Sequence, residues 1–304
     1  MTGKHRPELD RSGTPAPPSG FEHVVAPSGA GTVHAVVGGT GPPLVLLHGW
    51  PQTWWTWHKV MPQLAANHQV IVPDLRGVGG SSITAGGYDK RTMAGDVLTM
   101  LQALGHERAS VVGHDIGGQV AYAFAAQHPE RTAHLAIMSA HVPDATCLDY
   151  RLLPGGPWKW WWALHMVEDV ADRLIASNLD FYIDHRIDRH DSGTNYDTSG
   201  ITAFDRGVYV RAYAAPGALT ASLQWYRAFP TDIADNESDF LTRPLAVPYL
   251  ALADPVTLPE MSRQAARIAR DPEVALVEPC GHWLPEQQPD LVVGALSEFL
   301  QRTG

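Results

Sequence analysis

The chain has 304 residues, of which 44% are hydrophobic, so it can bury the core of one large domain or of a domain with an insertion. Its formal net charge is −10, with only 22 Lys and Arg residues and no basic run longer than a dipeptide. This charge balance disfavours nucleic acid and an anionic membrane surface as partners.

The chain begins with a segment, residues 1–20, that is rich in Pro, Gly, Ser and charged residues and has no apolar core of the signal-peptide kind. We expect it to be a flexible tail. No later run reaches the length of a transmembrane helix. The two cysteines, Cys147 and Cys280, suggest neither a disulfide framework nor a metal pair, and this cysteine usage predicts a cytoplasmic protein.

Beyond the tail, short apolar runs alternate with helical patterns, which predicts a mostly parallel sheet with helices on both faces. The predicted strands are 32–37, 44–47, 70–72, 110–113, 134–138, 249–253 and 274–277. The predicted helices are 54–65, 92–104, 117–127, 259–270 and 289–301.

The alternation stops between about 141 and 232, where the sequence indicates helices joined by polar turns. We therefore predict an α/β core made of residues 21–140 and 233–304. Residues 141–232 are predicted to form an inserted helical cap.

A loop between a predicted strand and helix reads Gly113-His114-Asp115-Ile116-Gly117-Gly118. Its aspartate occupies the position of serine in the G-x-S-x-G nucleophile elbow. A carboxylate that attacks a saturated carbon leaves an ester, which water can cleave, whereas serine would leave a stable ether. Asp115 therefore indicates opening of a carbon–oxygen or carbon–halogen bond. Taken alone, the six residues fit a helix-capping aspartate equally well.

A second loop, Leu47-His48-Gly49-Trp50-Pro51, also connects a predicted strand to a helix. Such a loop can offer backbone N–H groups to a developing oxyanion. We expect the donors of this oxyanion hole to be Trp50 and Ile116. A plain strand-to-helix turn is the alternative interpretation.

A third loop, after the last predicted strand, carries His282. Because Asp115 is ionised at neutral pH, the imidazole is predicted to activate the water that hydrolyses the ester. Asp254 lies between the two in sequence. The order nucleophile, acid, histidine is the order of the α/β-hydrolase triad.

The chain resembles the epoxide hydrolase and dehalogenase branch of the α/β-hydrolase superfamily over nearly everything after the tail. The motifs that carry the resemblance, in the family's order and at similar separations, are His48-Gly49-Trp50-Pro51, Asp74-Leu75-Arg76-Gly77-Val78-Gly79-Gly80-Ser81-Ser82, Gly113-His114-Asp115 and Gly281-His282. The resemblance implies the α/β-hydrolase fold and an enzyme that needs neither a metal nor a cofactor. The glycine run 77–80 lacks the third glycine of a dinucleotide fingerprint.

Within that branch, the resemblance separates activities by the group that holds the leaving atom. Haloalkane dehalogenases carry a halide-binding Asn or Trp beside the oxyanion loop and directly after the nucleophile, where this chain has Trp50 and Ile116. Haloacetate dehalogenases place an arginine after the nucleophile, whereas Ile116 and Gln119 offer no charge. Both departures favour an epoxide as the substrate.

Epoxide hydrolases resemble one another in cap side chains that bind the oxirane oxygen, commonly two tyrosines, or a tyrosine with a histidine. Tyr226 matches the more C-terminal tyrosine, and Trp160 or Trp161 stands at the place of its partner. An indole N–H can donate a hydrogen bond but cannot surrender a proton, so Tyr226 is the expected proton donor. A role in lining an apolar pocket is the alternative for the two tryptophans.

The acid that orients His282 is predicted to be Asp254. Some relatives carry this acid after the strand that follows the nucleophile helix, where this chain has Ser139, and Asp144 is held in reserve. We therefore expect a hydrolase that uses water to convert a hydrophobic epoxide, with aromatic and polycyclic epoxides among the candidates, into a vicinal diol. A dehalogenase of the haloalkane or haloacetate type and a non-hydrolytic ligand-binding homologue are the alternatives. The sequence permits a homodimer.

Overall fold

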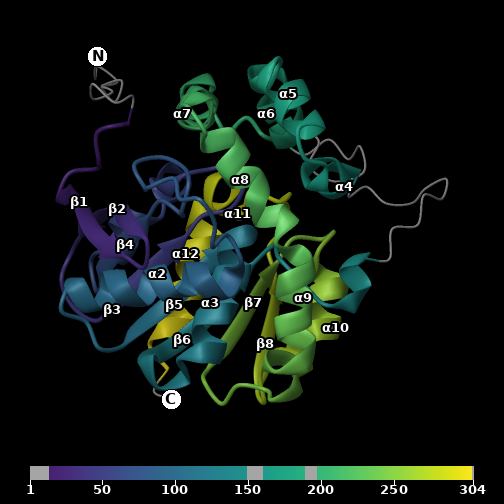
Figure 1. Cartoon of the computed structure of the whole chain (residues 1–304). Helices are drawn as coiled ribbons and strands as arrows, with labels where there is room; N and C mark the ends of the chain where they lie inside the picture. The colour runs from purple at the N-terminus through teal and green to yellow at the C-terminus, as the bar shows by residue number, and fades with distance from the viewer. Residues whose placement is uncertain (1–13, 149–159, 189–196, 303–304) are drawn as a thin grey trace.

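The computed structural model describes residues 14–148, 160–188 and 197–302, and its centre is an eight-stranded sheet (Figure 1). The strand order is β1-β2-β4-β3-β5-β6-β7-β8, with β2 antiparallel to both its neighbours and every later pair parallel. The expected mostly parallel α/β fold is thus confirmed. The strands are β1 (Phe21–Ser28), β2 (Gly31–Gly38), β3 (Pro43–Leu47), β4 (Gln69–Pro73), β5 (Ala109–His114), β6 (Thr132–Met138), β7 (Tyr249–Ala253) and β8 (Pro272–Leu276).

Helices cover both faces of this sheet. In Figure 1, α2 (Lys90–Ala103) and α3 (Ile116–Gln127) lie in front of the sheet, and α12 (Pro289–Leu300) lies behind it. The other helices of this part are α1 (Met61–Leu64), α9 (Phe229–Ser238), α10 (Leu258–Ile268) and α11 (Leu284–Gln287), with the short 3₁₀ turns η1 (Trp54–Trp57), η2 (Pro129–Arg131), η3 (Ala145–Leu148) and η4 (Phe240–Thr242).

Five further helices, here called the cap helices, gather at one end of the sheet, at the top of Figure 1. They are α4 (Trp160–Met166), α5 (Val170–Ala176), α6 (Leu179–Asp188), α7 (Ala203–Ala214) and α8 (Ala218–Arg227). Helix α7 starts with a capping box, in which the Thr202 hydroxyl and the Asp205 carboxylate each bind the other's backbone N–H.

The central strands are mostly buried. All six residues of β5 and the last four of β3 are buried, as expected for apolar parallel strands covered on both faces. Strand β1 was not predicted from the sequence. It is an edge strand with mostly exposed or half-buried residues, so it lacks a clear apolar signal.

The helix bounds differ from the prediction by a break within 54–65 and by one or two residues elsewhere. The helix expected at 54–65 is divided into η1 and α1, and Pro62, which cannot donate a backbone hydrogen bond, stands in the first turn of α1. Helix α2 begins two residues before the predicted position because the Asp89 side chain caps it, accepting a hydrogen bond from the Thr92 N–H.

Parts of the predicted tail and cap, residues 1–13, 149–159 and 189–196, lie outside the described residues. The proposed division into tail, core and cap therefore stays a prediction. Within the described ranges, no helix combines the length and the apolar character needed to cross a bilayer.

Candidate active site

Asp115 stands in a strained turn between β5 and α3. Its backbone has φ 52° and ψ −125°, a conformation that costs a non-glycine residue on the order of 1–3 kcal/mol. The turn is tight: a Cβ added to Gly113 would lie 2.1 Å from the carbonyl oxygen of Gly117. The chain thus adopts the nucleophile-elbow geometry that the motif predicts.

The loop after β3 holds one oxygen of this carboxylate. The backbone N–H of Trp50 donates to Asp115 Oδ1 at 3.0 Å. A Cβ on the preceding Gly49 would lie 2.3 Å from the Asp115 Cβ, so only glycine allows this close approach. Ile116, the first residue of α3, carries the adjacent backbone N–H. Of the two residues expected to form the oxyanion hole, Trp50 thus contacts the carboxylate and Ile116 follows it directly in the chain.

The loop after β8 brings His282 to the other oxygen, with Nε2 at 3.5 Å from Asp115 Oδ2. The side chains of His114 and Gln287 fix this loop. His114 Nε2 donates to the His282 carbonyl at 2.7 Å, and Gln287 Oε1 accepts from the N–H groups of Gly281 and Trp283 at 3.1 and 3.0 Å. The structure thus brings together the predicted nucleophile and the predicted base.

Asp254 is fully buried directly after β7. Its Oδ1 accepts from the N–H groups of Val256 and Thr257 at 2.8 and 3.2 Å, and its Oδ2 accepts from the hydroxyls of Ser139 and Thr257, both at 2.5 Å. Ser139 occupies the position where some relatives carry the acid. The two alternative acid positions therefore lie in hydrogen-bonding contact, although they are far apart in sequence.

Asp144, the reserve acid, has other partners. Its Oδ2 lies 3.4 Å from Arg263 and 3.1 Å from Arg267, and it accepts from Gln264 Nε2 at 2.9 Å. All three partners belong to α10, so Asp144 ties the loop after β6 to that helix.

Tyr226 reaches the site from α8. Its ring is buried and lies edge-on to Trp50, with the centroids 6.3 Å apart. Burial, reinforced by the negative charge of Asp115, raises the pKa of the Tyr226 phenol well above its usual value. The phenol thus keeps its proton at neutral pH.

His165 of α4, which the sequence analysis did not single out, lies between these aromatic rings. Its centroid is 4.5 Å from that of Tyr226 and 4.6 Å from that of Trp50. Its Nε2 lies 2.8 Å from the Tyr182 hydroxyl, and its buried Nδ1 has no hydrogen-bond partner among the described residues. Burial, followed by the charge of Arg186, lowers the His165 pKa well below 6.5, so the ring is neutral.

Helical spacing could have pointed to His165, because it lies four residues after Trp161 on the same face of α4. Trp160 and Trp161 themselves have different surroundings. Trp160 is 45% exposed and lies edge-on to Tyr182, while the buried Trp161 packs under the Arg186 guanidinium at 3.6 Å.

Polar contacts join the cap helices to the loop after β3. The Trp50 indole Nε1 donates to the Ser222 hydroxyl of α8 at 3.2 Å, and the Tyr213 hydroxyl of α7 donates to the Gln52 carbonyl at 3.1 Å. The loop whose Trp50 N–H donates to Asp115 is therefore bound to the cap helices as well.

A buried carboxyl group, that of Glu286, lies in the same seam, meaning the contact between the cap helices and the loop after β3. Glu286 Oε1 accepts from the Tyr209 hydroxyl of α7 at 2.8 Å, and its Oε2 accepts from Gln52 Nε2 and, at 3.4 Å, from the Thr56 hydroxyl. Burial raises the Glu286 pKa to about 8. This group therefore carries a proton for much of the time at neutral pH.

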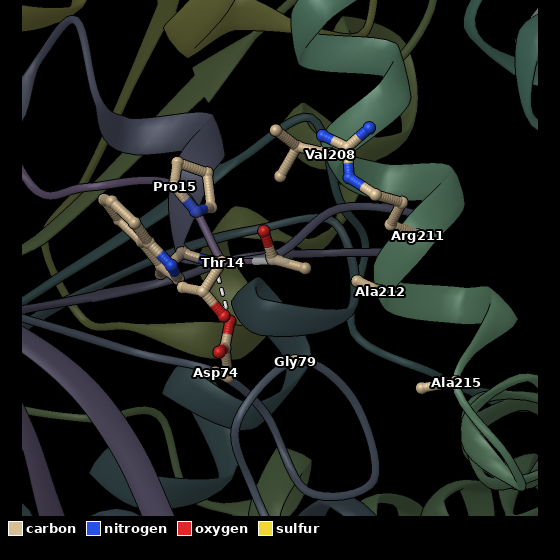
Figure 2. A pocket seen from close by; sticks show the side chains of 10 residues that line it. Thr14, Pro15, Asp74, Gly79, Val208, Arg211, Ala212 and Ala215 are labelled. Atoms are coloured by element: carbon tan, nitrogen blue, oxygen red, sulfur yellow. Dashed lines mark hydrogen bonds between the residues drawn. The ribbon is translucent and has the colours of Figure 1, made fainter. Parts of the chain in front are cut away.

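Figure 2 shows a separate cavity of about 60 Å³, where the chain near Thr14 and Pro15 meets α7. Arg211 of α7 and Asp74 are among its lining residues, but neither Asp115 nor His282 is. This cavity is thus distinct from the candidate active site.

Comparisons with known proteins extend the similarity beyond the loop motifs. A family model described as alpha/beta hydrolase fold matches residues 42–289. The chain is 33% identical over 278 residues to the soluble epoxide hydrolase of Corynebacterium sp. (strain C12), a match covering 88% of this chain and 93% of that protein. It is 30% identical over 295 residues to the fluoroacetate dehalogenase of Burkholderia sp, covering 92% and 94%.

A solved structure gives the same result in three dimensions. The epoxide hydrolase CorEH without ligand has a TM-score of 0.85 and 33% identity to this chain, with coverage of 92% of this chain and 98% of that chain. The similarity therefore includes the cap as well as the sheet.

Proposed function

The chain belongs to the α/β-hydrolase fold family and is a hydrolase, and we propose that it opens a hydrophobic epoxide to a vicinal diol through an ester on Asp115. The observation that carries this proposal is that the two oxygens of the Asp115 carboxylate have different neighbours. Oδ1 accepts the Trp50 N–H at 3.0 Å, and Oδ2 faces His282 Nε2 at 3.5 Å.

In the first step, Asp115 Oδ2 attacks a ring carbon and the carbon–oxygen bond breaks. The leaving oxygen takes a proton from Tyr226, whose raised pKa keeps the phenol protonated over the working range of pH. The buried aromatic rings of Trp50, Tyr182 and Tyr226 around this position favour an apolar substrate.

We assign the second hydrogen bond to the epoxide oxygen to His165, in place of Trp160 or Trp161. If the Tyr182 hydroxyl donates to Nε2 of the neutral ring, the proton of that ring is on Nδ1. A buried N–H without a partner among the described residues is costly unless a ligand accepts it. Its place beside Tyr226 suits the oxygen of a bound epoxide.

In the second step, His282 activates a water that attacks the ester carbonyl, and Asp254 is the group we assign to orient the imidazole. The negative charge then develops on Oδ1, where the Trp50 N–H already donates and the Ile116 N–H is adjacent. On collapse, the bond between the carboxyl carbon and the diol oxygen breaks and that oxygen takes the proton held by His282. The proton left on the Asp115 carboxyl group returns to Tyr226, which releases the diol and restores both residues.

A single turnover in ¹⁸O-labelled water, with enzyme in excess over epoxide, tests the ester. We expect the first diol to contain no label and the Asp115 carboxylate to gain it, measured by mass spectrometry of the product and of the peptide containing Asp115. Label that enters the first diol directly would remove Asp115 as the nucleophile.

The second candidate is a dehalogenase, favoured by the similarity to the fluoroacetate dehalogenase. The same Asp115 ester would form, with halide as the leaving group. Against it, Ile116 and Gln119 supply no charge next to the nucleophile, and Gln119 Nε2 already lies 3.4 Å from the His141 carbonyl. Halide release from a panel of haloalkanes and haloacids, compared with diol formation from epoxides, decides between the two.

A further inference from the structure

A thiol, an imidazole and a carboxylate lie in a row outside the candidate active site. Cys147 Sγ is 3.2 Å from His141 Nε2, and His141 Nδ1 is 3.5 Å from Glu260 Oε2. Cys147 belongs to η3, His141 to the loop after β6, and Glu260 to α10. Proteins use this order of groups to activate a nucleophile.

The loop that carries this row is firmly held. Gln264 of α10 accepts from the Val142 N–H at 3.0 Å and donates to the Val142 carbonyl at 2.8 Å. The turn of η3 is closed by the Cys147 N–H, which donates to the Asp144 carbonyl at 2.9 Å. On its other side, the His141 ring packs against Trp162, with the centroids 4.9 Å apart. The loop that carries Cys147 and His141, and the His141 ring itself, are therefore held by contacts that the row does not supply.

We propose that Cys147, His141 and Glu260 form a second nucleophilic site, which takes small uncharged alkylating electrophiles at the Cys147 sulfur. The imidazole accepts the thiol proton, the carboxylate stabilises the imidazolium, and the thiolate is the attacking species. With iodoacetamide, the sulfur–carbon bond forms as the carbon–iodine bond breaks. Iodide leaves with the bonding electrons, and the proton passes from His141 to solvent.

The charges around this row are of both signs. Glu237 of α9 accepts from the Ala145 N–H at 3.2 Å and pairs with Arg267 at 2.8 Å, and Asp144 pairs with Arg263 and Arg267. The side chains that α3 and α4 present here, Gln119 and Trp162, carry no charge. Glu260 also takes part, with Oε1 at 3.9 Å from Arg263, while its Oε2 faces His141 Nδ1 and is the carboxylate oxygen placed to stabilise a His141 imidazolium.

The chain contains its own matched control. Cys280 is the only other cysteine, and it is as buried as Cys147, each with 6% of its surface exposed. The neighbours of Cys280 disfavour its thiolate, whereas His141 would favour that of Cys147. Burial and the charge of Asp254 raise the Cys280 pKa to about 12. A difference in reactivity between the two thiols therefore reports their neighbours and not their exposure.

The experiment treats the folded full-length chain with iodoacetamide and follows each cysteine by peptide mass spectrometry. We expect Cys147 to react at least about tenfold faster than Cys280 at pH 7, since the thiolate fraction sets the rate. His141→Asn should reduce the Cys147 rate about tenfold and leave the Cys280 rate unchanged. Equal rates at the two cysteines, or a Cys147 rate indifferent to His141→Asn in a folded variant, would overturn the site.

The pH profile of the unaltered chain gives a second answer that needs no variant. A thiol paired with imidazole should reach half of its maximal alkylation rate below about pH 7, whereas an ordinary thiol does so near pH 8.5. A Cys147 rate that is still rising steeply at pH 8.5 would contradict the proposal. The proposed epoxide hydrolysis does not enter this measurement, so the two proposals stand or fall separately.

Discussion

The two sides of the candidate active site are built in different ways. On the core side, backbone geometry fixes the groups: Asp115 stands in a strained turn, and the Trp50 N–H reaches it because Gly49 has no side chain. On the cap side, side chains position one another, as where the His165 ring lies against Tyr226. A site fixed by backbone geometry can be recognised in the sequence from its glycines and loop motifs, whereas a site fixed by contacts between side chains has no such local motif.

The sharpest test of the core side is Asp115→Asn. The amide has nearly the same shape and can still accept the Trp50 N–H, but it is not a nucleophile, so we expect kcat to fall by at least about 10⁴-fold. The measurement is diol formation under saturating epoxide. An unchanged melting temperature would show that only the chemistry was lost, and retention of more than a few per cent of activity would contradict the assignment.

On the cap side, Tyr226→Phe removes the proposed proton donor and keeps the ring. We expect kcat to fall about 10²-fold, the usual contribution of a positioned acid. The matched control is Tyr213→Phe, because the Tyr213 hydroxyl is already bound to the Gln52 carbonyl. That variant should lose stability and change kcat little. Equal losses of kcat in the two variants would mean that the Tyr226 hydroxyl has no special role.

The smallest expected effect concerns the seam between the two sides. Because the Glu286 pKa is raised to about 8, the folded chain binds this proton more tightly than the unfolded chain, whose ordinary carboxyl value is 4.5. The stability that this proton provides is complete below about pH 4.5 and is lost as the pH rises through about 8. Glu286→Gln should remove this loss.

Melting temperatures between pH 5 and 9 check the prediction. We expect the variant to gain on the unaltered chain steadily as the pH rises, by a few degrees in total. Parallel curves for the two proteins would show that Glu286 ionises normally.

The sequence predicted the sheet, the elbow and the loops of Trp50 and His282, because glycine, proline and short apolar runs constrain the backbone locally. It missed β1, whose exposed residues carry no apolar pattern, and the break between η1 and α1. It also pointed to Trp160 and Trp161 where the structure brings His165 to Tyr226. Which face of a cap helix meets the nucleophile depends on packing between helices distant in sequence, and residue spacing does not encode that packing directly.

Trp50 has a consequence for protein engineering. Its main-chain N–H holds the Asp115 carboxylate, while its indole is anchored to Ser222 of α8. If the cap helices were replaced by those of a relative, the new helices would have to supply a hydroxyl at the Ser222 position, or the Trp50 indole would lose this hydrogen bond. Two chimeras that carry the same foreign cap helices, with and without a hydroxyl at position 222, would separate two effects. The difference between them reports the lost Trp50 hydrogen bond, and what they share reports the effect of the foreign helices on substrate choice.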